Sequence, residues 1–173
     1  DMISKIVVPI AKDETGGTLF DKLAEAGAKL LVETLPHIFD GTAVYEKQPE
    51  ESPTPYAGMI TKQMGLINFG KSAEELERLV RGLNPWPSAF TFWNGKTLKV
   101  WESFVVKSEE AGAEKSEPGT VVKTDKKGIY VACGEDVLVL SQVQLEGKKR
   151  MDADAFLRGC HIETGSRFTD KKE

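Results

Sequence analysis

The chain has 173 residues, of which 40% are apolar and 29% are charged, as is typical of one large globular domain or one small domain with an additional segment. The formal net charge of −4 argues against a general nucleic-acid binder, and no apolar run approaches the roughly 20 residues of a membrane helix. The two cysteines and two histidines lack the spacing of a metal site or a disulfide framework. We therefore expect a cytoplasmic protein with no metal and no membrane segment.

The first part of the chain predicts one strand and one helix. Residues 3–10 are rich in Ile and Val and predict a buried strand. Residues 13–18 form a polar helix entry, after which apolar residues recur at helical spacing, at Leu19, Leu23, Ala26 and Leu30. Residues 48–55 predict an extended acidic linker. One strand and one helix cannot enclose a core, so we interpret residues 1–57 as the last βα unit of an α/β domain plus its linker.

The second part, residues 58–173, begins with a capped helix. Ser72 and Glu75 form a capping box, and a helix with one apolar face follows it as far as Gly82. The next residues form a rigid corner, Asn84-Pro85-Trp86-Pro87, because two prolines forbid further helix. We expect Trp86, held between the prolines, to act as a structural plug and not as a platform for bases.

Short strands follow the corner at regular intervals. Two strands, residues 89–93 and 98–106, are joined by the hairpin turn Asn94-Gly95. Residues 108–117 predict a charged loop, and three more strands follow at residues 120–123, 128–132 and 137–145. A short helix with Asp152 as its N-cap ends the pattern. This succession predicts a mainly β domain with flanking helices, folded as a small, partly open barrel of the OB kind.

The densest basic run in the chain is Lys148-Lys149-Arg150, between the last long strand and the last helix. A loop at this position can present three cations to a phosphate backbone, although a solvated turn without a partner is the alternative. Further cations could support such a contact: Lys62, Lys71, Arg78, Arg81, Arg158 and Arg167. Residues 1–57 contain five Lys and ten Asp or Glu, whereas the remainder is nearly balanced, so an RNA contact must come from a local patch in residues 58–173.

Several aromatic residues could form a base-stacking surface: Phe90, Phe92, Trp93 and Trp101. Strand alternation places about half of them in the core, so electrostatic, shape-based contact with RNA is the favoured reading. The sequence contains no Ser-His-Asp or Cys-His arrangement and no phosphate-binding glycine loop. We therefore assign no catalytic residue.

Three motifs occur in order: Arg-Gly-Leu-Asn-Pro-Trp-Pro at 81–87, Asn-Gly-Lys-x-Leu-Lys-Val-Trp at 94–101 and Glu-Gly-Lys-Lys-Arg-Met at 146–151. On these motifs the chain resembles the C-terminal part of the methionyl-tRNA formyltransferase family. The resemblance implies that residues 58–173 form the OB-like C-terminal domain, which docks initiator methionyl-tRNA. It also implies that residues 1–57 close a formyltransferase domain whose earlier strands are missing.

The resemblance places the family's catalytic Asn, His and Asp and its folate site upstream of Asp1. The parent enzyme would use 10-formyltetrahydrofolate, whereas this chain alone should bind no cofactor, be inactive and bind tRNA weakly. The catalytic domain would be its natural partner, and the exposed βα unit would also allow self-association. The alternative is the accessory barrel of a formyltransferase or formyl hydrolase that acts on a small substrate, such as a sugar amine or formyltetrahydrofolate.

Overall fold

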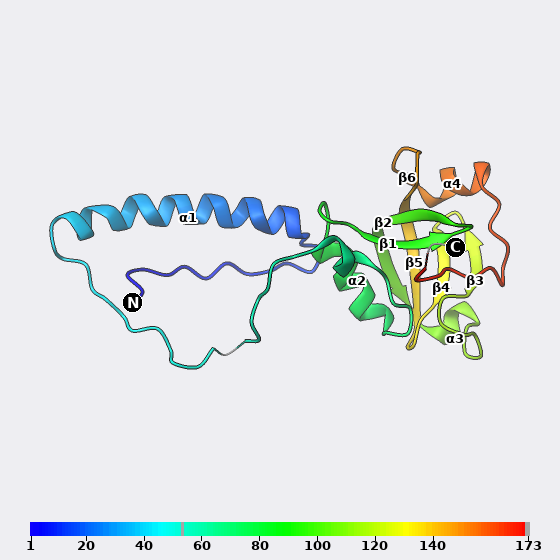
Figure 1. Cartoon of the computed structure of the whole chain (residues 1–173), viewed down its shortest axis with the longest axis horizontal. Coiled ribbons are helices and arrows are strands. Elements are labelled where there is room, and N and C mark those ends of the chain that lie inside the picture. The colour runs from blue at the N-terminus through cyan, green and yellow to red at the C-terminus, as the bar shows by residue number, and fades with distance from the viewer. Residues whose placement is uncertain (53, 172–173) are drawn as a thin grey trace. The chain divides into compact units, whose positions relative to one another are not determined.

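The computed structural model describes residues 1–52 and 54–171. The chain divides into two compact units, Asp1–Met59 and Ile60–Glu173. The first unit contains one long helix, and the second contains an antiparallel sheet with short helices around it (Figure 1).

Helix α1, Gly16–Phe39, dominates the first unit. Its N-terminus is closed by a reciprocal pair of hydrogen bonds: the Thr18 amide donates to the Thr15 hydroxyl at 3.1 Å, and the Thr15 amide donates to the Thr18 hydroxyl at 3.0 Å. The buried carboxylate of Glu14 lies beside them and forms an ion pair with Lys22. The predicted polar helix entry is therefore confirmed, and the structure identifies Thr15 as its N-cap.

The strand predicted at residues 3–10 does not form, and this prediction is wrong. The bridge nearest to this segment, among the described residues, lies just before it, where Met2 and Glu46 exchange backbone hydrogen bonds of 2.7 and 2.8 Å. Val7 is 90% exposed. A strand needs a neighbouring strand that accepts and donates backbone hydrogen bonds along its length. Residues 1–52 and 54–59 provide no such neighbour. The described residues of the predicted linker are irregular and exposed, and Pro53 lies outside them.

The sheet of the second unit follows the sequence pattern closely. Its strand order is β1-β2-β5-β4-β3, all neighbours are antiparallel, and β6 pairs with β5. The strands are β1 Ala89–Trp93, β2 Lys96–Val106, β3 Val121–Asp125, β4 Gly128–Ala132, β5 Val137–Leu145 and β6 Met151–Asp152. Asn94 and Gly95 have φ angles of 48° and 69°, as the predicted hairpin turn requires.

The sheet is open, with β1 and β3 at its two edges. The C-terminal segment lies between these edges: Thr169 forms a bridge with Phe92 of β1, and Arg167 forms a bridge with Thr120, just before β3 (Figure 1). The predicted mainly β class with flanking helices is confirmed. Strand pairing does not close the sheet into a barrel in the described part of the chain; the C-terminal segment spans the gap instead.

Helix α2, Ala73–Gly82, covers the core. Ser72 caps it by accepting from the Glu75 amide at 3.3 Å, and Leu76 and Val80 are fully buried against the sheet. The remaining helices are η1 Lys62–Gly65, α3 Ser108–Ala111 and α4 Ala153–Gly159. Helix α3 lies where a loop was predicted, and strand β6 was not predicted. Both elements are too short to leave a periodic signal in the sequence.

Candidate nucleic-acid interface

The β5–β6 turn carries the basic run that the sequence singled out. Gly147 has a φ of 78°, which favours glycine, and the amide of Lys148 donates to the Leu145 carbonyl at 2.9 Å. The turn is tied to the start of β2, because the amide of Glu146 donates to the Thr97 carbonyl at 2.8 Å. Lys148, Lys149 and Arg150 are exposed on this turn. We call these three residues the cationic loop.

Trp101 lies beneath the cationic loop because β2 bulges there. Val100 pairs with Val143 and Glu102 pairs with Gln142, so Trp101 is an extra residue without a partner in β5. The guanidinium carbon of Arg150 lies 4.8 Å from the centroid of the indole ring, and the ammonium nitrogen of Lys99 lies 5.6 Å from it. Such cation–π contacts fix the cations over the indole ring.

Gln144 joins Trp101 to the backbone of the cationic loop. The indole Nε1 of Trp101 donates to Oε1 of Gln144 at 3.1 Å, and Nε2 of Gln144 donates to the Lys148 carbonyl at 2.9 Å. Both polar ends of the glutamine amide are therefore satisfied. The loop is held by side chains from β2 and β5, in addition to its own turn geometry.

Arg150 differs from its two neighbours. Its guanidinium forms an ion pair with Glu102 at 3.1 Å and a hydrogen bond with Gln142. Lys148 and Lys149 have no acidic partner within 4 Å among residues 1–52 and 54–171. The geometry gives Arg150 a positioning role and leaves the two lysines available to an anion.

Most of the predicted supporting cations are paired with nearby carboxylates. The pairs are Lys71–Glu75 at 3.2 Å, Arg78–Glu74 at 3.6 Å, Arg81–Glu77 at 2.6 Å, Arg167–Glu117 at 2.9 Å and Arg158–Asp154. Lys62 on η1 is exposed and forms no ion pair within the part of the chain described. The structure thus brings Lys148, Lys149 and Arg150 together, whereas Lys71, Arg78 and Arg81 lie at or on α2, Arg158 lies on α4 and Arg167 lies on the C-terminal segment.

Two lysines of β2 belong to this surface and were not predicted. Lys99 lies over Trp101, and Lys96 is adjacent to Thr97, which is bonded to Glu146 just before the cationic loop. Their signal was available: Lys99 and Trp101 alternate with the buried residues Leu98 and Val100, so they must point to the opposite face of the strand.

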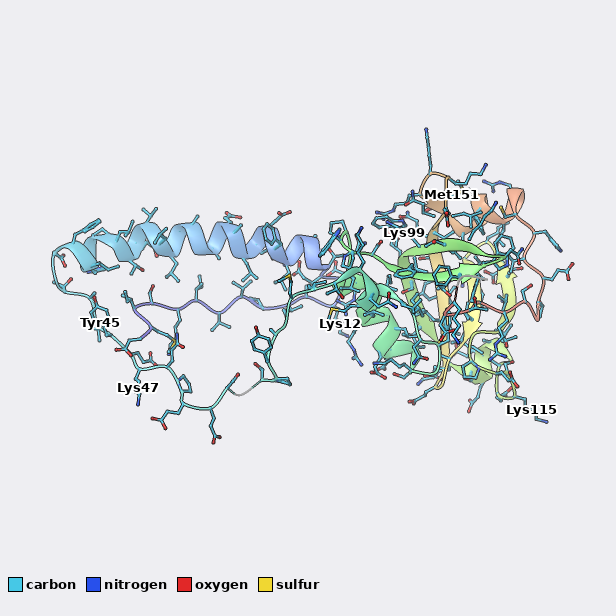
Figure 2. The ribbon with its side chains drawn as sticks, in the orientation of Figure 1. Lys12, Tyr45, Lys47, Lys99, Lys115 and Met151 are labelled. Atoms are coloured by element: carbon cyan, nitrogen blue, oxygen red, sulfur yellow. The ribbon has the colours of Figure 1, made fainter. Side chains whose placement is uncertain are left out.

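The charge of the second unit differs between its ends. Lys99 and Met151 mark the end that carries the cationic loop, and Lys115 marks the other end (Figure 2). Glu109 and Glu110 lie on α3 after the far end of β2. Nearby, Lys107 bonds to Asp136 at 2.7 Å, and this hydrogen bond keeps the pKa of the aspartate below its ordinary value. An anionic partner is therefore favoured at the end with the cationic loop.

The structure overturns the expected role of Trp86. The corner forms as predicted at Asn84–Pro87, but the Trp86 side chain is 58% exposed and cannot be a buried plug. The aromatic residues predicted as a stacking surface are less accessible than Trp86. Phe90 and Phe92 are half-buried and contact each other edge to face at 5.7 Å, and Trp93 packs on Phe156 of the core.

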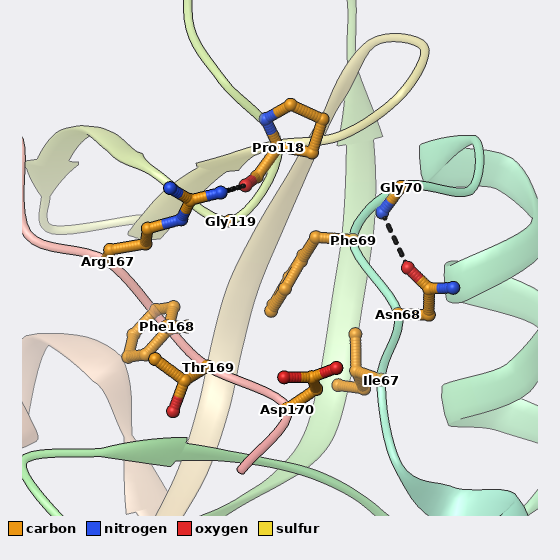
Figure 3. Close-up of a pocket in the computed structure, with 10 residues that line it drawn as sticks. All are labelled: Ile67, Asn68, Phe69, Gly70, Pro118, Gly119, Arg167, Phe168, Thr169 and Asp170. Atoms are coloured by element: carbon orange, nitrogen blue, oxygen red, sulfur yellow. Dashed lines mark hydrogen bonds between the residues drawn. The ribbon is translucent and has the colours of Figure 1, made fainter.

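A cavity of about 540 Å³ lies elsewhere in the second unit, among residues 67–70, 118–119 and 167–170 (Figure 3). Phe69 and Phe168 are stacked with their centroids 6.1 Å apart, and Arg167 and Asp170 supply its charged groups. Both rings are buried, so they offer little free surface to a ligand. Across the described residues, no cluster of His, Cys, Asp or Glu could hold a metal ion. No helix among them is long and apolar enough to cross a membrane.

Comparison with known proteins identifies the family of this chain. Residues 59–161 match the family described as formyl transferase, C-terminal domain. The chain therefore belongs to the formyl transferase C-terminal domain family.

Particular relatives carry a more specific name. The chain is 54% identical over 169 residues to the methionyl-tRNA formyltransferase of Agathobacter rectalis, an alignment that covers 98% of this chain and 53% of that protein. It is 48% identical over 166 residues to the methionyl-tRNA formyltransferase of Bacillus subtilis, covering 95% of this chain and 52% of that protein. The chain thus spans about half the length of these curated relatives.

A solved structure agrees at the level of the fold. A crystal structure of a variant of HypX from Aquifex aeolicus matches with a TM-score of 0.56 and 10% sequence identity, covering 85% of this chain and 26% of that one. At this identity the likeness shows a shared fold and no shared function.

Proposed function

We propose that the second unit is the tRNA-docking part of a methionyl-tRNA formyltransferase, the enzyme that transfers a formyl group to initiator methionyl-tRNA. The observation that carries the proposal is the cationic loop. Lys148 and Lys149 are exposed and free of acidic partners in the described structure, while Arg150, Trp101 and Gln144 hold the loop in place. Phosphate contacts from such a loop position an RNA without reading its sequence.

The chemistry itself would depend on residues outside this chain. In this proposal 10-formyltetrahydrofolate is the formyl donor of the whole enzyme, and the 173 residues supply docking alone. The exposed apolar face of α1 supports a further contact: Phe20 and Leu31, which lie on nearly the same side of the helix, are 72% and 57% exposed. The remaining part of the enzyme would cover this face, and self-association would cover it when that part is absent. Analytical ultracentrifugation of the chain alone measures the second outcome.

Salt-dependent tRNA binding tests the docking role. Each phosphate contact releases counterions, so the logarithm of the binding constant should fall linearly with the logarithm of the salt concentration. Replacing both Lys148 and Lys149 by Ala should weaken tRNA binding and reduce the slope by about one unit for each lysine. The matched control is Lys115→Ala, an exposed lysine away from the cationic loop, which should change neither quantity.

An unchanged slope in the double-lysine variant would place the docking surface elsewhere. Absence of any tRNA binding by the chain would instead favour the accessory role in an enzyme with a small substrate.

A further inference from the structure

Trp86 is a large, exposed aromatic residue whose backbone is restrained by the two prolines of the corner. The residue is 58% exposed, while Leu83, Pro87 and Ser88 around it are buried. The corner is fastened to the end of α2, because the Ser88 amide donates to the Leu83 carbonyl at 2.9 Å. A tryptophan fixed in this way loses little conformational entropy when a partner covers it, which is why rigid Trp residues recur at binding hot spots.

The corner is also fastened to the strand that supports the cationic loop. Nδ2 of Asn84 donates to the carbonyl of Trp101 at 3.0 Å, and Ala89, just after the corner, pairs with Val100. Trp101 in turn lies under Arg150 of the cationic loop. A continuous path of contacts therefore runs from the Trp86 corner through the β2 bulge to the cationic loop.

We infer that Trp86 is a stacking platform for an unpaired nucleotide base, and that the cationic loop holds phosphates of the same strand. The inference rests on the proposed function and names the part of the RNA that Trp86 and the cationic loop bind. Bases stack on exposed aromatic rings whatever their identity, while neighbouring cations follow the backbone. A fully paired helix offers no free base, so the occupant must present a single-stranded loop or end.

The other aromatic residues near the cationic loop cannot take this role. The Trp101 ring already carries Arg150 and Lys99. Phe90 and Phe92 are half-buried, and the backbone of Phe92 is paired with Thr169. Trp86, at 58% exposed, is more accessible than Phe90, Phe92, Trp93 and Trp101, none of which is exposed.

The test compares two RNA probes with the full 173-residue chain: single-stranded octaadenylate and a blunt-ended RNA duplex of the same length. Trp86→Ala should weaken octaadenylate binding by about fivefold or more and leave duplex binding unchanged. Trp86→Phe keeps an aromatic ring and should retain most of the affinity. Tyr56→Ala, which removes another exposed aromatic ring, is the matched control and should leave the affinity for both probes unchanged. Thermal melting of each variant confirms that it is folded.

Trp fluorescence gives a second readout that needs no alanine variant. Octaadenylate should quench the emission of the wild-type chain and quench that of Trp86→Phe much less, because the half-buried Trp93 packs on Phe156 and the half-buried Trp101 carries Lys99 and Arg150 over its ring. Equal quenching of the wild-type and Trp86→Phe chains would overturn the inference. So would an equal loss of affinity for octaadenylate and for the duplex in Trp86→Ala. The double-lysine variant separates it from the proposed function: that variant should lose affinity for both probes, and if it loses affinity for neither, the docking role fails.

Discussion

The guanidinium carbon of Arg150 lies 4.8 Å from the ring centroid of Trp101, although the two residues are 49 positions apart in the chain. The same guanidinium is paired with Glu102, the residue after Trp101. A β-bulge therefore supplies both the aromatic face and the carboxylate that fix one end of the cationic loop. The loop's geometry depends on β2 as much as on its own sequence.

Trp101→Ala should release the cationic loop. The variant loses the two cation–π contacts and the bond to Gln144, so the free energy of unfolding should fall by about 1–3 kcal/mol. Trypsin should also cut after Lys148 and Lys149 faster than in the wild type, because a mobile loop is cleaved more readily. Urea denaturation and timed proteolysis measure these effects. Wild-type cleavage rates in the variant would show that Trp101 does not hold the loop.

Gly134→Ala should destabilise the second unit. A Cβ at this position would lie 2.2 Å from the Gly70 carbonyl oxygen, and the contact is with backbone that cannot rotate away. The Gly134 amide also donates to the carbonyls of Phe69 and Lys71, at 2.8 and 2.9 Å, so the clash would disturb both bonds. We expect a loss of about 1–3 kcal/mol in urea denaturation. Gly82→Ala is the control: nothing lies within 4 Å of its Cβ, and it should be neutral or slightly stabilising.

Asp136 should make the second unit sensitive to acid. The hydrogen bond from Lys107 lowers the pKa of this aspartate in the folded state, so its contribution is present above its unfolded pKa of roughly 3.9 and is lost as the pH falls through the folded pKa. Asp136→Asn should therefore reduce the free energy of unfolding at neutral pH, and reduce it less once the pH falls below the lowered pKa of the folded state. Asn also tolerates the φ of 63° at this position, so the substitution isolates the charge. An equal loss of unfolding free energy at neutral and at acidic pH would show that the charge of Asp136 does not stabilise the second unit.

The two cysteines should differ in reactivity. Burial raises the pKa of the Cys133 thiol to about 11, whereas Cys160 is only half-buried. The thiolate is the reactive form, so Cys133 should remain unmodified in the folded chain below about pH 9. Iodoacetamide labelling followed by peptide mass spectrometry should find Cys160 labelled first. Similar rates for both residues in the folded protein would mean that Cys133 is not shielded, and labelling in urea provides the reference for full exposure.

The sequence by itself determined the local elements of the second unit. The predicted bounds of β1, β4 and β5 agree with the structure, as do the Ser72 cap and the Asn94-Gly95 turn. Caps, turns and strand alternation are set by residues within a few positions of one another, so they can be read directly from the chain. The three cations of the basic run could be found for the same reason.

The tertiary structure decided which cations and aromatic residues remain available to a partner. Glu102 neutralises Arg150 from 48 positions away, and Arg167 is paired with Glu117, so the sequence overestimated the number of free cations. Trp86 was assigned to the interior because of its prolines, yet burial depends on what packs against a residue and not on how rigid its backbone is. The strand predicted at residues 3–10 failed for a related reason: hydrophobic residues favour a strand, but a strand forms only where a neighbour completes its hydrogen bonds.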